Sequence, residues 1–350
     1  MLKKSELIKI KNLLENSQNP LFFFDNDVDG LCSFLLLQRA IGRGKGIVIK
    51  SFPDLDETYL KRIDELSPDA VFILDKPRVK KEFITSVLER GLPLTWIDHH
   101  NVQNEKPEKK ILEKIHYFNS APSSEPTTYL AHSVYKRKKD IWIAMIGCVG
   151  DGYKPDFSKE FTEKYPELFN ISLTPFQAHY TTEIGRAIKL LNFGLKDTTT
   201  NVVNLIKFLT KANSIYKILE ENQENKQLYK RYNEINKVYE RLIEKATKEN
   251  SQNKSKLFWF SYSGTTSMTS EISNELFFKN QNKLVVIVNR KPDRANISIR
   301  GNNAHKIVLK AIKNIQGATG GGHEKACGAS VPPDKIQEFR EKIETLLNQL

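Results

Sequence analysis

Short apolar runs alternate with longer amphipathic segments over the first part of the chain. Four runs have the length and the β-branched or aromatic content of buried strands: residues 21–24, 46–51, 70–75 and 92–98. Three segments between them have helical periodicity: residues 29–41, 56–66 and 78–90. This alternation predicts a parallel sheet with helices on both faces, and the carboxyl ends of its strands meet at one edge.

The middle of the chain is expected to be helical. Residues 155–200 are mostly helical by pattern, with prolines in the loops. The segment 201–250 contains almost no glycine or proline, and apolar residues recur in it at intervals of three and four: Leu228, Tyr232, Ile235, Tyr239 and Leu242. This periodicity predicts one long amphipathic helix, which packs on the protein or, alternatively, forms a coiled-coil dimer seam.

The remaining predicted helices and strands also indicate an α/β protein. They are helices at 1–18, 127–136, 141–149 and 267–278, and strands at 111–118, 256–262, 283–289 and 295–300. We therefore expect an α/β protein whose N-terminal parallel-sheet domain, residues 1–195, is joined by a linker helix region, 196–252, to a smaller α/β domain, 253–350.

Composition excludes several classes of protein. Hydrophobic residues make up 39% of the 350 residues and charged residues 27%, as in soluble globular proteins. No apolar run approaches the roughly 20 residues of a membrane helix, and the N-terminal segment is amphipathic rather than a signal peptide. We expect a cytoplasmic protein without a membrane partner. Cys32, Cys148 and Cys327 are too far apart for a disulfide framework or a zinc ribbon.

The net charge of +12 is unevenly distributed. Residues 1–200 hold 29 Lys and Arg against 27 Asp and Glu (+2), whereas residues 201–350 hold 25 against 15 (+10). This asymmetry is expected if one half holds cations and the other binds a polyanion such as nucleic acid. The alternative is a lysine-rich solvated surface.

A run of alternating aspartates follows the first predicted strand. Asp25, Asp27 and Asp29 stand at the turn into a helix that begins near Gly30. Three carboxylates at alternate positions repel one another unless a positive charge lies among them, which indicates a divalent metal site. An acidic turn that caps the helix is the alternative, since aspartate is favoured there.

Three further aspartates are candidates for the same site as this acidic turn. Asp75 and Asp98 end the predicted strands that belong to the same sheet edge, and His99 and His100 follow Asp98 directly. Imidazole beside carboxylate suits Mn, Fe or Zn better than Ca. Asp151 lies between Gly150 and Gly152, which lets the backbone approach a ligand closely or simply ends a helix.

Taken in chain order, these pieces resemble the four motifs of the DHH phosphoesterase superfamily. The quoted motifs are Asp25-x-Asp27-x-Asp29-Gly30, Asp75 after a strand, Asp98-His99-His100 and Gly150-Asp151-Gly152. Downstream, Gly320-Gly321-Gly322-His323 resembles the glycine-rich motif of DHHA1 domains. The resemblance spans residues from about 20 to 340. The first motif is similar to the RecJ type, because residues 21–24 offer only Leu and Phe where nanoRNases and family II pyrophosphatases usually have a His.

The resemblance implies a two-metal centre, usually manganese, with magnesium possible. It implies that Asp75 bridges the two ions, that Asp27 binds one of them, and that the other is bound by Asp29, His99 and Asp151. Asp25 would stand where related families place a His ligand. His100 would face the scissile phosphate, with Asp98 orienting the histidine pair. The candidate catalytic residues are thus Asp75, Asp98, His99 and His100.

Substrate contacts are expected in the second half. Ser298 and Arg300 resemble the Ser-x-Arg of DHHA1 domains that contacts the nucleic-acid backbone, although an arginine at a strand end is often a surface salt-bridge partner. Gly320, Gly321 and Gly322 are interpreted as a loop whose N–H groups surround one phosphate, with His323 donating to the same oxygens. A flexible glycine loop with an incidental histidine is the alternative.

The function implied is that of a metal-dependent exonuclease, similar to the compact RecJ-like proteins of archaea. It would hydrolyse single-stranded DNA, RNA or both to mononucleotides, and partners in replication or repair are compatible with this role. One alternative is a nanoRNase-like or cyclic-dinucleotide phosphodiesterase that acts on small substrates. Another is a Cdc45-like replication scaffold that has lost catalysis, although every expected ligand position here holds a competent residue.

Overall fold

The computed structural model describes residues 1–50, 54–101, 109–252 and 254–349, without the side chain of His323. Ser51, at the end of a predicted strand, and Asn253 and Leu350, at the ends of the predicted third domain, lie outside the described residues. The chain divides into two compact units, 1–232 and 233–350, and the division falls within helix α13 (Lys226–Asn250). Each unit is described by itself.

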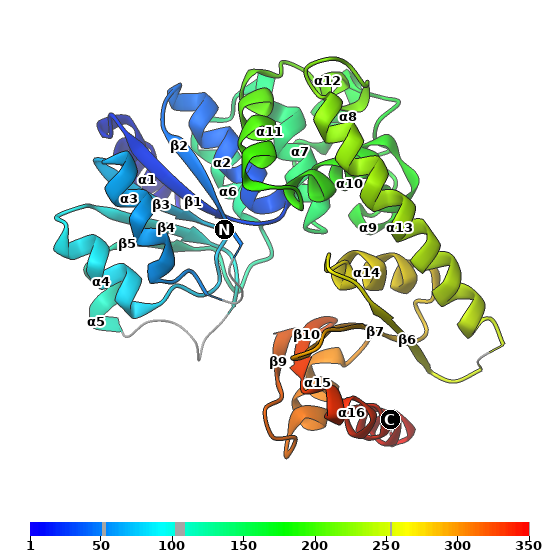
Figure 1. Cartoon of the computed structure of the whole chain (residues 1–350). Helices are drawn as coiled ribbons and strands as arrows, with labels where there is room; N and C mark the ends of the chain where they lie inside the picture. Colours follow the sequence, from blue (N-terminus) through cyan, green and yellow to red (C-terminus); the bar gives the residue numbers. More distant parts are fainter. Residues whose placement is uncertain (51–53, 102–108, 253, 350) are drawn as a thin grey trace. The chain divides into compact units, whose positions relative to one another are not determined.

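The first unit is built on a five-stranded parallel sheet in the order β2-β1-β3-β4-β5 (Figure 1). The strands are β1 (Pro20–Asp25), β2 (Lys45–Ile49), β3 (Ala70–Leu74), β4 (Leu94–Asp98) and β5 (His116–Asn119). All four neighbouring pairs run parallel. The predicted parallel α/β fold is confirmed in this unit.

Helices connect and cover these strands. They are α1 (Lys4–Asn16), α2 (Val28–Ile41), α3 (Leu60–Leu66), α4 (Lys81–Glu89), α5 (Lys109–Leu112), α6 (Thr127–Tyr135), α7 (Ile141–Gly150), α8 (Ser158–Lys164), α9 (Pro175–Thr181), α10 (Glu183–Leu195), α11 (Thr199–Lys211) and α12 (Tyr216–Leu219). Short 3₁₀ turns lie at Glu57–Tyr59 and Lys138–Asp140. No helix within the described part of the chain is both long and apolar enough to cross a membrane.

Alternate residues of β1 enter two different cores, one on each face of the sheet. Phe22 and Phe24 belong to the larger core, which also includes α2, α6 and α7. Leu21 and Phe23 belong to the core formed with α3 and α4, where the Phe23 ring meets the Phe83 ring edge-on at 5.5 Å. Both faces are therefore covered, as a parallel sheet requires.

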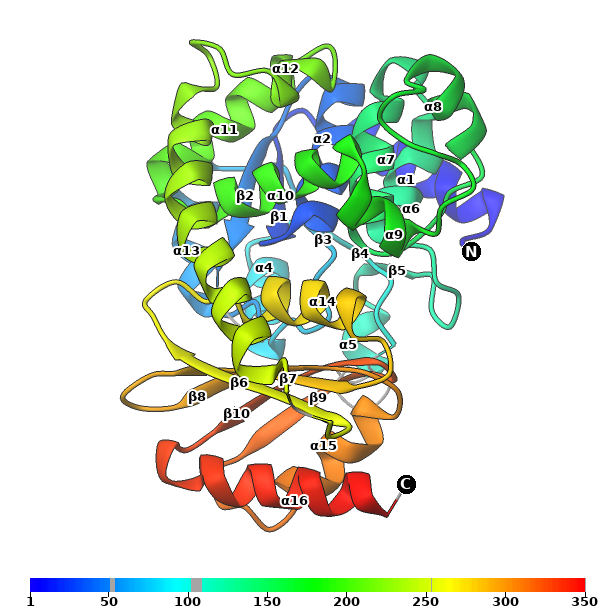
Figure 2. The same cartoon turned by 90° about the vertical axis from the view of Figure 1, so that its right-hand side faces the viewer.

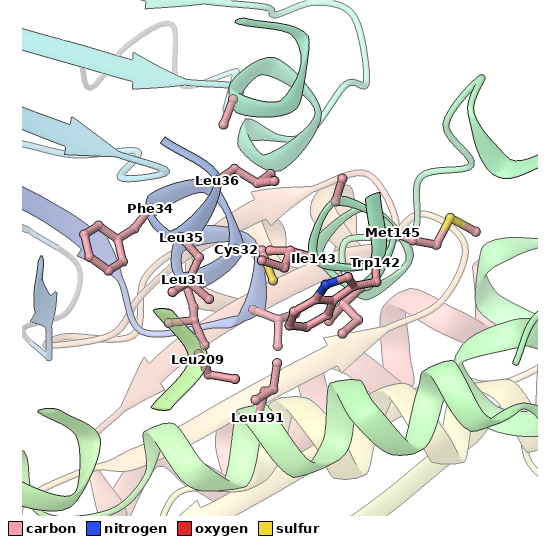
Figure 3. Close-up of a cluster of buried hydrophobic side chains, with 14 of the residues drawn as sticks. Leu31, Cys32, Phe34, Leu35, Leu36, Trp142, Ile143, Met145, Leu191 and Leu209 are labelled. Atoms are coloured by element: carbon pink, nitrogen blue, oxygen red, sulfur yellow. The ribbon is translucent and has the colours of Figure 1, made fainter. Parts of the chain in front are cut away.

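Helix α2 lies in the centre of the larger core. Its residues from Val28 to Leu37 are all buried. Figure 3 shows Leu31 and Leu35 of α2 among Trp142 of α7, Leu191 of α10 and Leu209 of α11. Because apolar side chains surround α2, its N-terminal turn is held in one position, and this turn carries the aspartate motif.

The second unit contains a mixed five-stranded sheet in the order β6-β7-β8-β10-β9. Its elements after α13 are β6 (Leu257–Ser263), α14 (Thr269–Lys279), β7 (Leu284–Arg290), β8 (Ala295–Arg300), α15 (Ala304–Ile312), β9 (Thr319–His323), β10 (Ala326–Val331), a 3₁₀ turn (Pro333–Lys335) and α16 (Ile336–Asn348). Only β6 and β7 pair in parallel among these strands. Figure 2 shows α14 on one face of this sheet and α15 with α16 on the other.

The predicted single helix over 201–250 is wrong, because three helices occupy this region: α11, α12 and α13. Polar side chains form turns between them. Asn225 is buried, its side-chain amide donates to the carbonyls of Lys217 and Glu220, and its side-chain oxygen accepts from the Asn222 backbone N–H. Asparagine competes with the helical hydrogen-bond pattern in this way. Only 226–250 forms the long amphipathic helix.

Two other local predictions are also wrong. The predicted strand at 111–118 begins as helix α5, and only His116–Asn119 pairs with β4. The predicted glycine loop contains strand β9, in which Gly320, Gly321 and Gly322 pair with β10. Cross-strand backbone pairing therefore holds these glycines in a strand.

Candidate metal centre

The carboxyl ends of three neighbouring strands carry the predicted acidic residues. Strand β3 pairs with both β1 and β4, and Leu74 is opposite Phe24 on one side and Ile97 on the other. Asp25 ends β1, Asp75 follows β3, and Asp98 ends β4. The parallel register thus brings all three aspartates to the same edge of the sheet, as expected from the sequence.

The turn between β1 and α2 places the first motif against this edge. Asp27 is the N-cap of α2, and its Oδ1 accepts from the Gly30 backbone N–H at 2.9 Å. A Cβ at position 30 would lie only 2.5 Å from the Asp25 carbonyl oxygen. Glycine is therefore required for α2 to begin this close to β1. The predicted helix-capping role of Asp27 is confirmed, and it is compatible with a ligand role.

Asp29 is buried and fixed by the start of another helix. Its Oδ2 accepts from the Thr127 backbone N–H at 2.9 Å, and its Oδ1 accepts from the Thr128 backbone N–H at 2.7 Å. These are N–H groups of the first turn of α6, where a carboxylate is favoured. The sequence analysis missed Thr127 and Thr128 as partners of the first motif.

His99 brings the separated motifs together. Its Nε2 atom lies 3.4 Å from Asp75 Oδ1, 3.7 Å from Asp29 Oδ2 and 3.8 Å from Asp151 Oδ2. The three aspartates come from the end of β3, the first turn of α2 and the C-terminal end of α7. The His99 side chain is only 11% exposed. Carboxylates distant in sequence thus surround one imidazole nitrogen.

Asp75 has an unusual backbone conformation for a residue with a side chain. Its φ is +58°, in the left-handed region, and its N–H donates to the Ile97 carbonyl at 2.9 Å. Its Oδ1 accepts from the Thr127 hydroxyl at 3.2 Å and lies 4.0 Å from His100 Nδ1. Such conformations persist only where the surrounding structure holds them and are common at functional sites.

The His100 side chain is held by Asp98, which in turn accepts a hydrogen bond from Asn119. Its Nδ1 lies 2.8 Å from Oδ1 of Asp98, which is fully buried. The Asn119 side chain donates to Asp98 Oδ2 and to the His100 carbonyl, both at 3.1 Å, and also bonds the Tyr117 hydroxyl. Asp98 therefore contacts His100, and Asn119 is a supporting residue that the sequence analysis missed.

A buried lysine also belongs to this edge. Lys76 follows Asp75, and its Nζ lies 3.0 Å from Asp25 Oδ1. Its side chain is 1% exposed, while that of Asp25 is 25% exposed. The sequence analysis placed Asp25 among the metal ligands and did not consider Lys76. Only the spacing of Lys76 next to Asp75 could have indicated this pair.

Burial, and then mutual repulsion, raise the pKa values of several of these acids. Burial and then the charges of Asp29 and Asp27 raise the pKa of Asp75 well above its usual range. Asp27 is an exposed residue, yet desolvation by nearby protein and then the charges of Asp25 and Asp29 raise its pKa to about 6. Asp151, whose side chain is 37% exposed, has a raised pKa because of desolvation and then the charges of Asp29 and Asp27. A cation in the cluster would relieve this repulsion.

His100 shows the opposite electrostatic effect. Burial alone would lower the pKa of His100, but the hydrogen bond to Asp98 and the charges of Asp98, Asp151 and Asp27 raise it to about 9. The nearby carboxylates therefore favour a cation at this position as well.

The donor geometry fits divalent metal ions. Among the described residues, two groups have ligand atoms that all lie within 4.8 Å of one another: Asp75, His99 and His100, and Asp29, His99 and Asp151. Asp25 and Asp27 are in neither group. Mixed carboxylate and imidazole donors suit Mn, Fe or Zn.

In the second unit, the predicted substrate residues Ser298 and Arg300 lie on β8 beside the start of α14. The Ser298 hydroxyl donates to Thr269 Oγ1 at 2.9 Å. The Arg300 guanidinium donates to Asn274 Oδ1 at 2.5 Å and to the Ser270 hydroxyl at 2.9 Å. It also donates to the Ile299 and Cys327 carbonyls. Arg300 therefore has a fixed orientation and is not a free surface arginine.

The glycine motif lies at the edge of the second sheet. Strand β9 has β10 as its neighbour on one side and is the last strand in the sheet order. Gly321 pairs with Gly328, and a Cβ at position 321 would have no heavy atom within 4 Å. Gly320, Gly321 and Gly322 are thus part of a strand, although Gly322 has a φ of +139°, and the side chain of His323 lies outside the described part of the structure.

Comparison with known proteins agrees with this geometry. The DHHA1 domain model matches residues 254–349, whereas no curated protein matches the sequence. The fold is similar to RecJ from Thermus thermophilus in complex with Mn²⁺, with a TM-score of 0.68 and 12% identity over 100% of this chain and 55% of that one. The chain thus spans about half the length of that protein.

Two other solved structures match over most of their own length. The DHH domain of a member of the s1p family of ribosomal proteins has a TM-score of 0.72 and 15% identity, over 99% of this chain and 91% of that one. An exonuclease RecJ bound to manganese has a TM-score of 0.61 and 13% identity, over 100% and 96%. The chain therefore contains a DHHA1 domain at residues 254–349 and has a fold similar to that of RecJ.

Proposed function

We propose that this protein is a metal-dependent phosphodiesterase that hydrolyses single-stranded DNA, RNA or both to mononucleotides. The observation that carries the proposal is the convergence of Asp29, Asp75 and Asp151 on one nitrogen of His99, within 3.8 Å. A structural role alone would not require four ionisable side chains from four parts of the chain to meet, with the pKa values of Asp75 and Asp151 raised.

The residues at this edge have proposed roles toward two divalent cations, Mn²⁺ or Mg²⁺. Asp75 is the proposed bridging ligand, Asp27 binds one ion, and Asp29, His99 and Asp151 bind the other. Divalent ions supply Lewis acidity: they polarise phosphoryl oxygens and lower the pKa of water. Asp29 has a second function, because its two backbone hydrogen bonds orient its carboxylate toward His99.

His100 is the proposed contact to the scissile phosphate. His100 Nδ1 pairs with Asp98, and the raised pKa of His100, about 9, keeps the ring protonated on both nitrogens at neutral pH, so Nε2 is also able to donate to a phosphate oxygen. Asn119 holds Asp98 in place from behind. This arrangement positions a hydrogen-bond donor, and Asp98 acts through the imidazole without contacting the substrate.

The second unit is proposed to bind the nucleic-acid backbone. Arg300, whose guanidinium is fixed by Asn274 and Ser270, and Ser298 are the proposed phosphate contacts together with the glycine strand and His323. An arginine held by neighbouring groups loses little rotamer entropy on binding a phosphate. The charge of +10 over residues 201–350 supports a polyanionic substrate and predicts that salt weakens binding steeply.

One experiment tests the proposal directly. End-labelled single-stranded DNA and RNA twenty-mers and a dinucleotide are incubated with the protein and Mn²⁺, Mg²⁺ or EDTA. We expect mononucleotide release with metal, none with EDTA, and none from Asp75→Asn. The matched control is Asp64→Asn, which removes an exposed carboxylate paired with Arg90 on the surface and should retain full activity.

The same assay separates the alternative functions. Faster turnover of the dinucleotide than of the twenty-mers would favour a small-substrate phosphodiesterase. Strand binding without cleavage under every metal condition would favour a scaffold role and would contradict the proposal.

A further inference from the structure

We propose that a pocket beside helix α6, away from the candidate metal centre, binds a ribonucleoside 5′-monophosphate. The inference goes beyond the proposed function and needs neither a metal ion nor cleavage of a strand. The observation that carries it is a cavity of about 370 Å³ whose lining combines aromatic rings, two lysines and two carboxylates. Small-molecule sites have volumes of this order and combine an apolar surface with a few polar groups.

The pocket lies toward the C-terminal end of α6, whereas the N-terminal end of this helix holds the metal centre. The backbone N–H of Thr128, in the first turn, donates to Asp29. His132 and Lys136, the C-cap of α6, line the pocket instead. Thr128 and Lys136 are about 12 Å apart along the helix. The rest of the lining comes from the start of α7 and from α8 with the residues before it, and Figure 2 shows α6, α7 and α8 next to one another.

Three aromatic side chains give the pocket a surface on which a planar ligand can stack. The Phe157 ring lies 6.1 Å from the Tyr129 ring, with 9° between the two planes, and 4.5 Å from the His132 ring. Burial lowers the pKa of His132 to about 4, so its imidazole is neutral at pH 7. Nucleobases stack on aromatic side chains of this kind. The rings therefore favour a ligand that contains a nucleobase.

Two exposed lysines supply positive charge for a phosphate group. Lys136 has a left-handed conformation, with a φ of +48°, and Lys138 begins the 3₁₀ turn that follows α6. Within the described part of the chain neither lysine forms an ion pair, whereas Arg137 between them pairs with Asp140 at 3.2 Å. Lysine ammonium groups bind phosphate as point charges. Both are thus available to a phosphate monoester at this side of the pocket.

Two carboxylates line the pocket from another element. Asp156 precedes α8 and Glu160 lies in its first turn, and neither is in an ion pair among the described residues. A carboxylate repels phosphate but accepts hydrogen bonds from hydroxyl groups. In dinucleotide-binding folds a carboxylate recognises the ribose hydroxyls in this way. A ligand with a base, a phosphate and a ribose satisfies all three parts of the lining, and the carboxylates favour ribose over deoxyribose.

The test measures binding of adenosine 5′-monophosphate (AMP) to the full chain by isothermal titration calorimetry at neutral pH in EDTA. Adenosine, 2′-deoxy-AMP and phenylalanine are compared as ligands. Three variants change the pocket: Lys136→Gln with Lys138→Gln, Asp156→Asn with Glu160→Gln, and Phe157→Leu. The matched control for the lysine pair is Lys139→Gln with Lys159→Gln, which removes two exposed lysines from the same 3₁₀ turn and from α8. Circular dichroism checks that each variant is folded.

We expect the wild type to bind one AMP per chain with a Kd below about 1 mM. Loss of Lys136 and Lys138 should weaken AMP binding at least about tenfold, because the phosphate loses both cations, and adenosine should bind the wild type equally poorly. The wild type should bind AMP about fivefold more tightly than 2′-deoxy-AMP, and the variant without the two carboxylates should lose this preference. The control pair should bind AMP as the wild type does.

Several results would overturn the inference. They are no AMP binding up to about 5 mM, equal loss of affinity in the lysine variant and its control, and equal affinity of the wild type for AMP and 2′-deoxy-AMP. Tighter binding of phenylalanine than of AMP would overturn it as well, since the pocket would then recognise an amino acid. If Phe157→Leu does not fold, the exposed lysines and the ligand series decide. A protein that binds AMP in EDTA but cleaves no strand with metal would contradict the proposed function alone.

Discussion

Oδ1 of Asp75 and Nε2 of His99 lie 3.4 Å apart, although 24 positions separate the two residues in the sequence. Each follows one of two paired parallel strands, β3 and β4. The pair is thus a direct consequence of strand register. Asp75 also lies near His100 and accepts from Thr127, which makes it a central residue of the cluster.

The first prediction concerns Asp75→Asn without metal. Burial and then the neighbouring carboxylates raise the pKa of Asp75 above its value in the unfolded chain. The unfolded chain therefore ionises first as pH rises, and the folded state loses stability until the pH has passed the raised pKa. The amide variant has no such cost. We expect it to melt several degrees higher than the wild type at pH 8 in EDTA, with a smaller difference at pH 5.

The measurement uses tryptophan fluorescence in a Trp259→Phe background, because Trp96 and Trp142 then report on the first unit alone. Activity with Mn²⁺ should fall by at least about a hundredfold, the loss of a few kcal/mol of charge stabilisation. A metal-free Asp75→Asn protein that melts below the wild type at pH 8 would show that repulsion does not dominate this site.

Asp29→Asn should lower the stability of the metal-free protein, whereas Asp75→Asn should raise it. Both carboxylate oxygens of Asp29 accept backbone N–H groups at the start of α6, from Thr127 and Thr128. An amide would turn its NH₂ group toward one of these donors. We expect the free energy of unfolding of the first unit to fall by about 1–3 kcal/mol in EDTA, measured by urea titration in the same background. Asp75→Asn is the matched comparison. If both variants changed the free energy of unfolding by the same amount and in the same direction, the separate structural role of Asp29 would be contradicted.

The sequence predicted where the acidic residues lie on the sheet better than it predicted the contacts that hold them. Strand ends can be read from short apolar runs, and parallel βαβ order brings Asp25, Asp75 and Asp98 to one edge. The contacts of Lys76 and Thr127 could not be predicted in this way. They depend on a left-handed turn and on where α6 begins in space, and neither leaves a periodic signal.

Failures elsewhere have a similar cause. The region 201–250 lacks glycine and proline, and periodicity alone predicted one helix. Asn222 and Asn225 interrupt it because their side chains bond to the backbone, which composition does not reveal. The glycines at 320–322 indicated a loop, but pairing with β10 makes them a strand. Tertiary and cross-strand hydrogen bonds decided both cases.

A third prediction concerns the pH dependence of the Asp98–His100 pair. The pKa of His100 is raised to about 9, above the usual 6.5, so its contribution to stability is complete below pH 6.5 and is lost as pH rises through about 9. Asp98→Asn removes the negative charge that contributes to the shift and leaves only a weaker, neutral hydrogen-bond acceptor. We expect the His100 pKa to fall by at least one unit and activity by about 10- to 100-fold.

Nuclear magnetic resonance titration of the histidine ring protons in metal-free protein measures this pKa directly. His132 is the internal control: burial lowers its pKa to about 4, and Asp98 is not among the groups that shift it. A His100 titration that is the same in the wild type and in Asp98→Asn would contradict the proposed pairing.

The last prediction concerns Arg39, which connects three helical regions of the first unit. Its guanidinium binds Asp140, which is fully buried, and its Nη1 donates to the carbonyls of Leu209, Thr210 and Ala212 at the end of α11. Arg39→Met leaves a buried carboxylate with less compensation and removes the cap of α11. We expect a loss of about 3–5 kcal/mol in the unfolding free energy of the first unit.

Amide hydrogen exchange should show the largest gain over α11, because its terminal carbonyls lose their donor in Arg39→Met. Arg62→Met is the control: the Arg62–Glu65 pair is 40% and 52% exposed, and its loss should cost less than about 1 kcal/mol. If both variants lose similar amounts of stability, Arg39 does not hold these helices together. If Arg39→Met loses much more, one buried cation supports the helices that surround α2, and through α2 the turn that carries Asp27 and Asp29.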